Sequence, residues 1–135
     1  MSTQYQTNLD QIDHRITINE ANELIGRFQD NRNGIISGDF ENEDPFTNCQ
    51  TFNKDAITAL LDQQGCVGLR SYFGMYNSSA PEDKQGKIVF VLCGVDEDGN
   101  DLNLSPSSSD TDQIILEDAQ LCPPLCPATS KINNL

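Results

Sequence analysis

The chain has 135 residues, of which 36% are hydrophobic and 21% charged, a composition too apolar for a wholly disordered protein. This length suits one domain with a sizeable core, so a single domain is expected over residues 1–135. The 21 acidic and 8 basic residues give a formal net charge of -13, which disfavours nucleic acid and anionic membranes as partners and leaves proteins.

Residues 1–15 are expected to form a polar N-terminal arm. They lack the basic segment and following apolar run of a secretory signal peptide. The longest strongly apolar run, residues 88–95, is far shorter than the roughly 20 residues needed to cross a bilayer. We therefore expect a cytoplasmic protein with no membrane association. In that compartment cysteines usually stay reduced, whereas export without a visible signal would allow at most two disulfides among the five.

Two helices are predicted in the first half of the chain. Thr17 with Glu20 three residues later forms a capping box, which predicts that the first helix starts there and ends before Gly34. A short strand is expected at residues 35–36. Asn53 predicts the start of the second helix, and Gly65 its end. The apolar stripes expected to be buried are Ala21, Leu24, Ile25 and Phe28 in the first helix and Ala56, Ile57, Leu60 and Leu61 in the second.

Strands are predicted at residues 66–76 and 87–95, with a third near Leu102 and a fourth at 113–118. Both faces of the second strand are apolar, so each needs cover, from the helices on one side and from the tail or another molecule on the other. The fold class is therefore α+β: two N-terminal helices packed on a small antiparallel β-sheet in residues 16–120, followed by a tail over 121–135 that contains proline and cysteine.

The segment "DEDGND", residues 96–101, places Asp96, Asp98 and Asn100 at the spacing of a calcium-binding loop. The pattern then breaks, because Asp101 stands at the sixth position, where Gly is required, and Ser107 at the twelfth, where Glu is required. The interpretation that we favour is a hairpin turn.

The segment "CPPLCP", residues 122–127, separates Cys122 from Cys126 by three residues. Zinc or an iron–sulfur cluster would need further ligands such as Cys66 and Cys93, so Cys122 and Cys126 are candidates for only half of a metal site. Three alternatives stay open: free thiols in a stiff tail docked against the body, a disulfide, or a metal site. The first is favoured.

Catalytic signatures are scarce. The one histidine, His14, lies in the polar arm, and the sequence has no glycine-rich phosphate loop, H-E-x-x-H or G-x-S-x-G motif. We therefore expect no enzymatic activity and no cofactor. Arg70 lies in the middle of a predicted strand, where it either pairs with a carboxylate or receives an anionic group of a partner. The structural pairing is favoured, and Arg70 is kept as a possible interaction residue.

The segments "GCVGLR", "VDEDGND" and the C-terminal "CPPLCP" resemble the pattern of a group of small uncharacterised bacterial proteins. The resemblance extends from about Thr17 to the C-terminus. The resemblance implies a single domain, and no activity or ligand follows from it.

The leading hypothesis is a non-enzymatic protein–protein interaction or structural protein that self-associates, through strand edges, into a homo-oligomer. An alternative is an acidic inhibitor, of the immunity-protein type, that binds a basic partner protein; the charge of -13 motivates it. A further alternative is a cysteine-based metal-binding protein that uses Cys122 and Cys126.

Overall fold

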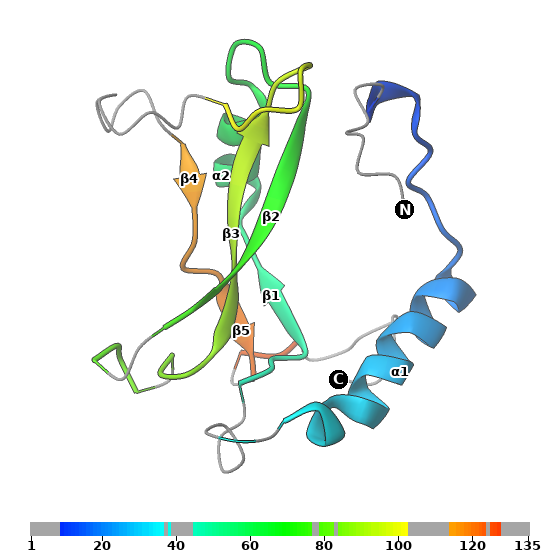
Figure 1. The fold of residues 1–135 in the computed structure, drawn as a ribbon, viewed down its shortest axis with the longest axis vertical. Helices are drawn as coiled ribbons and strands as arrows, with labels where there is room; N and C mark the ends of the chain where they lie inside the picture. The colour runs from blue at the N-terminus through cyan, green and yellow to red at the C-terminus, as the bar shows by residue number, and fades with distance from the viewer. Residues whose placement is uncertain are drawn as a thin grey trace. The chain divides into compact units, whose positions relative to one another are not determined.

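A computed structural model describes residues 9–36, 38, 45–76, 79–82, 84–102, 114–123 and 125–127 of the chain. It contains helices and antiparallel sheets and is therefore of the α+β class, as predicted (Figure 1). The elements, in chain order, are η1 (Leu9–Gln11), α1 (Ile18–Ile35), β1 (Cys49–Thr51), α2 (Lys54–Leu61), β2 (Gly68–Met75), β3 (Ile88–Val95), β4 (Ile115–Leu116) and β5 (Gln120–Cys122).

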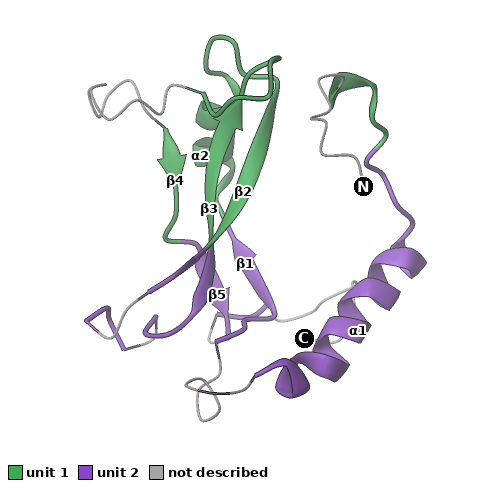
Figure 2. Ribbon diagram, in the orientation of Figure 1, with its two compact units in different colours: residues 1–13, 52–73, 90–118 green, residues 14–51, 74–89, 119–135 purple. Residues whose placement is uncertain are grey.

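The chain divides into two compact units (Figure 2). Unit 1 comprises residues 1–13, 52–73 and 90–118, and unit 2 comprises residues 14–51, 74–89 and 119–135. This division does not test the expectation of a single domain, which therefore stays a prediction.

Helix α1 begins at the predicted cap. The hydroxyl of Thr17 accepts a hydrogen bond from the backbone N–H of Glu20 (3.1 Å) and donates one to its carboxylate (3.0 Å). The predicted end is wrong, because the helix continues through Gly34 to Ile35, and no strand forms at 35–36. Gly34 does not have the positive φ that often ends a helix. Glycine lowers the stability of a helix interior but can still adopt the helical conformation, so the helix continues through it.

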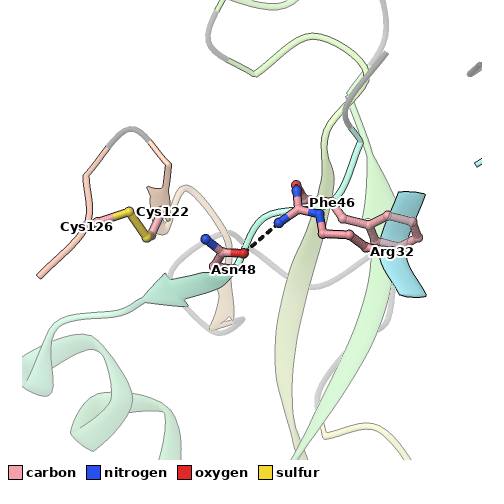
Figure 3. The surroundings of a disulfide bond; sticks show 5 residues. All are labelled: Arg32, Phe46, Asn48, Cys122 and Cys126. Atoms are coloured by element: carbon pink, nitrogen blue, oxygen red, sulfur yellow. Dashed lines mark hydrogen bonds between the residues drawn. A yellow bond between two sulfur atoms is a disulfide. The ribbon is translucent and has the colours of Figure 1, made fainter. Parts of the chain in front are cut away.

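The predicted apolar stripe of α1 is only partly covered, since none of its residues is buried and Leu24 is exposed. Its last turn is attached to the segment before β1. The guanidinium of Arg32 donates hydrogen bonds to the side chain of Asn48 (2.6 Å; Figure 3) and to the carbonyl of Phe46. The rings of Phe28 and Phe46 meet edge to face.

Helix α2 also begins where predicted, with the side chain of Asn53 accepting a hydrogen bond from the N–H of Ala56 (2.7 Å). The helix ends at Leu61, so the end predicted from Gly65 is too late, although Gly65 does adopt a positive φ of 85° in the turn that follows. Of the predicted buried face, only Leu60 is fully buried; Ala56 and Ile57 are half-buried, and Leu61 is exposed.

The strands form two sheets where one was expected. The larger has the order β2-β3-β4 and the smaller pairs β1 with β5. β1 and β5 were missed because each has only three residues, too few to display an alternating pattern. The strand predicted near Leu102 is reduced to an isolated antiparallel bridge between Val95 and Asp101, and the one predicted at 113–118 to the two residues of β4.

The cores follow the apolar runs of the sequence. Buried apolar side chains are Leu60, Leu92, Cys93, Val95 and Leu102 in unit 1 and Val89, Leu121 and Cys122 in unit 2. In unit 1 the last residues of β3 are buried on both faces, as predicted for a central strand. The chain itself supplies this cover: a Cβ at Gly94 would meet the side chains of Cys66, Gln63 and Leu102.

Candidate interaction surface on strand β2

Strand β2 is one edge of the three-stranded sheet, with β3 as its neighbour on the inner side. The pairing is antiparallel: Val67 donates its N–H to the carbonyl of Val95 at one end, and Tyr76 donates to Lys87 at the other. In the described part of the chain no strand pairs with the outer side of β2. An edge strand of eight residues is long enough to accept a further strand.

The two faces of β2 differ in chemistry because successive side chains of a strand point to opposite faces. Arg70 and Tyr72 both reach Asp101 and therefore share one face. Leu69, Ser71 and Phe73 occupy the alternate positions, on the other face. One face of β2 is thus polar and internally paired, and the other carries apolar side chains.

The polar face is organised around the carboxylate of Asp101. Its Oδ1 accepts a hydrogen bond from the guanidinium of Arg70 at 2.5 Å, and its Oδ2 accepts one from the hydroxyl of Tyr72 at 2.5 Å. Arg70 donates a second bond to the carbonyl of Gly99 (3.0 Å). These bonds join β2 to the turn that follows β3.

The same bonds set the protonation of the cluster. The hydrogen bond from Tyr72, together with that from Arg70, lowers the pKa of Asp101 although partial burial opposes the shift. The bond to Asp101 in turn raises the pKa of Tyr72, and desolvation adds to this. Desolvation acts to lower the pKa of Arg70, but its bonds to Asp101 and Tyr72 raise it overall. Arg70 therefore stays charged, with its charge committed to Asp101.

The turn at residues 96–101 is the predicted hairpin turn. The carboxylate of Asp96 accepts the backbone N–H groups of Asp98 (2.9 Å) and Asn100 (3.0 Å), and Asp96 and Asn100 are joined through the backbone (2.9 Å). Gly99 adopts a positive φ of 86°. The Asp96 carboxylate is thus committed to closing the turn.

The apolar face of β2 carries the most exposed large hydrophobic side chain in the described residues. Phe73 is 79% exposed, and Leu69 (42%) and Val67, just before the strand (47%), are exposed as well. The Phe73 ring contacts Phe90 of β3 at a centroid distance of 5.3 Å, which fixes its direction without covering it. We call Val67, Leu69 and Phe73 the β2 apolar surface.

Cys93 lies in β3 beside the polar cluster and is 1% exposed. Desolvation by burial, followed by the charge of Asp101, raises the pKa of its thiol. A buried thiol held protonated in this way is unreactive and fills space in the core.

The remaining predicted site residues belong to other elements of the chain. Cys122 and Cys126 are joined by a disulfide, so the favoured expectation of free thiols is wrong and the second alternative applies; neither sulfur is a thiolate ligand in this form (Figure 3). Among the described residues no group of three or more His, Cys, Asp or Glu side chains gathers to hold a metal. His14 lies in exposed coil before α1.

Sequence reasoning singled out Arg70 but missed Phe73. The alternation of Leu69, Ser71 and Phe73 was visible, but it could not show which strand would be the edge of the sheet. That follows from the order β2-β3-β4, which no local pattern encodes.

Comparisons with models of protein families, with curated proteins and with solved structures found no match. None of the helices in the described ranges is long and apolar enough to span a membrane.

Proposed function

We propose that the protein is a non-enzymatic interaction protein that self-associates through strand β2. The observation that carries the proposal is the β2 apolar surface on an edge strand, with Phe73 79% exposed. Burying such side chains against a second copy removes apolar area from water, while edge-to-edge pairing satisfies backbone N–H and carbonyl groups.

The distribution of charge favours a second copy at this strand. β2 lies within residues 63–81, a run between Asp62 and Glu82 that contains no acidic residue in a chain of charge -13. When two copies meet along this run, the run itself adds no carboxylate–carboxylate repulsion between them. Repulsion between the rest of the two chains still opposes assembly, and salt screens that repulsion.

The sequence of β2 is also self-complementary about Ser71. In a two-fold antiparallel pairing centred on Ser71, Leu69 of each copy lies opposite Phe73 of the other, on the same face. Cross-strand pairs of an aromatic and an aliphatic side chain stabilise sheets. The small Ser71 side chain at the two-fold axis leaves room for both Phe73 rings.

Native mass spectrometry and sedimentation velocity over a range of concentrations, at low and high salt, test the proposal. We expect a dimer whose fraction rises with concentration and with salt. A monomer at every concentration and salt would refute self-association.

A cysteine at position 71 tests the pairing. Because Ser71 faces its own copy across the axis, Ser71→Cys should form an intermolecular disulfide under mild oxidation. Thr58→Cys, an exposed position on α2, and the unmodified chain are the matched controls. A dimer in solution without the Ser71→Cys cross-link would refute this register and leave self-association standing.

The charge of -13 supports a second candidate, an acidic inhibitor of the immunity-protein type that binds a basic protein. The two proposals respond to salt in opposite ways, because salt weakens attraction between unlike charges and relieves repulsion between like ones. The third, a cysteine-based metal protein, applies to the reduced chain alone, since Cys122 and Cys126 are otherwise bonded to each other.

We also propose that nucleic acid and membranes are not partners, on the basis of the same charge. A cytoplasmic location stays a proposal, against which the Cys122–Cys126 disulfide weighs, because disulfides persist best in oxidising compartments. Fractionation of the native source cells with a blot for the protein would decide the location.

A further inference from the structure

Three of the five cysteines lie in or just after the small β1–β5 sheet of unit 2. Cys122 of β5 is bonded to Cys126 (Figure 3). Cys49 of β1 has a free thiol and is the direct cross-strand partner of Cys122. The tail disulfide therefore lies next to a third sulfur, a juxtaposition independent of the surface on β2.

Directly opposed residues of an antiparallel pair have Cα atoms about 4.5–5.5 Å apart, with side chains on the same face. Disulfides form between cysteines whose Cα atoms are about 4.4–6.8 Å apart. The existing bridge has a Cα separation of 4.6 Å, within the same range. Cys122 can therefore bond to either neighbour without a rearrangement of the β1–β5 pairing, but to only one at a time.

We propose that Cys49, Cys122 and Cys126 form a thiol–disulfide exchange site with two disulfide isomers. Cys49 loses its proton to water, and its thiolate attacks the Sγ of Cys122. The Cys49–Cys122 bond forms, the Cys122–Cys126 bond breaks, and its electron pair passes to the Sγ of Cys126, which takes up a proton from water. One disulfide and one thiol are present before and after, so no oxidant or reductant is needed.

The three sulfurs differ in how deeply they are buried, and this difference gives each a distinct role in the exchange. Cys122 is fully buried and shared by both isomers, Cys49 is half-buried, and Cys126 is exposed. A leaving thiolate at Cys126 is released into water, which solvates its charge. The exchange thus replaces the half-buried thiol of Cys49 with an exposed thiol at Cys126, which small thiols or disulfides in solution can reach.

The two isomers constrain the chain differently. The Cys122–Cys126 bond spans a sequence separation of 4 within the tail. The Cys49–Cys122 bond would tie β1 to β5 across a separation of 73, from 122 minus 49. Because a longer closed loop restricts the unfolded chain more, the second isomer should resist unfolding better. Exchange would therefore lock the small sheet while freeing the tail.

Peptide mapping separates the isomers. Trypsin cuts after Arg32, Lys54, Lys87 and Lys131, so Cys49 falls in peptide 33–54 and both Cys122 and Cys126 in peptide 88–131. The isomer with the Cys122–Cys126 disulfide leaves the two peptides separate, and the isomer with the Cys49–Cys122 disulfide links them. Because Cys93 also lies in peptide 88–131, the experiment is run in a Cys93→Ser background as well as in the native sequence.

The folded protein is held at mildly alkaline pH without added reductant, and samples are acid-quenched and alkylated over time. We expect linked peptides to accumulate, with Cys126 alkylated, and none in a Cys49→Ser variant. A matched Cys66→Ser variant should exchange like the parent, because Cys66 lies in unit 1.

A Cys126→Ser variant, oxidised mildly, checks the geometry alone by forming the Cys49–Cys122 bridge directly. If linked peptides never appear in the parent, or appear only in denaturant, the exchange site is refuted. The Cys126→Ser result then tells whether the placement of Cys49 or the exchange step is at fault. Alkylation of both Cys122 and Cys126 in protein purified without reductant would refute it too.

Discussion

Replacing Phe73 by serine should remove most of the proposed self-association. A phenylalanine side chain offers about 200 Å² of surface. With 79% of it exposed, about 160 Å² is left to bury, or at most about 4 kcal/mol at about 25 cal/mol per Å². Because binding also costs ordering, we take about 2 kcal/mol per copy, a common value for a central interface residue. A symmetric dimer loses this twice, which weakens its dissociation constant about a thousandfold.

Sedimentation equilibrium of Phe73→Ser beside the parent measures that change, with circular dichroism to confirm that both are folded. The matched control is Leu24→Ser, which removes an apolar side chain of α1 that is 57% exposed. We expect no change in association for it. An unchanged dissociation constant for Phe73→Ser, or an equal loss for Leu24→Ser, would refute the reasoning.

Three further variants test the polar cluster at Asp101, the cap of α2 and the core. Asp101→Asn should return the pKa of Tyr72 toward its ordinary value of about 10, seen as earlier ionisation in an alkaline absorbance titration. Because the folded-state pKa of Asp101 is lowered, its contribution to stability is present above its unfolded pKa of about 4 and is lost as pH falls below it; the variant should show a flatter acid limb in urea unfolding. Asn53→Ala should cost about 1 kcal/mol in the same assay by removing the α2 cap, a loss that Asn53→Asp should largely avoid. Leu60→Ala should cost about 2–5 kcal/mol because the side chain is fully buried, and a cost below 1 kcal/mol would contradict its place in the core.

Local signals in the sequence predicted the elements whose physics is local. Thr17 and Asn53 carry their own capping chemistry, and each helix begins at the residue after them. The central strand was recognisable because its run of apolar side chains has no polar face, which is typical of a strand covered on both sides.

The pairing of strands far apart in the chain could not be predicted from the sequence. Cys49 and Cys122 are separated by most of the chain, yet they are partners in the β1–β5 sheet, and three residues on each side contain no pattern that selects this register. The disulfide between Cys122 and Cys126 was one of three open alternatives, since consecutive prolines do not by themselves aim two sulfurs at each other.

The position of Arg70 explains why the apolar face of β2 is the face available for a partner. Its guanidinium is joined to Asp101 and to the carbonyl of Gly99, so its charge is already balanced within unit 1. To recruit it, an anionic partner would have to displace a charge-assisted bond that also holds the turn at residues 96–101. Arg70 therefore acts as a positioning residue, which fixes β2 against that turn and directs Phe73 outward on the opposite face. A partner that docks on Phe73 need not break any bond of the polar cluster, whereas one that docks on Arg70 must.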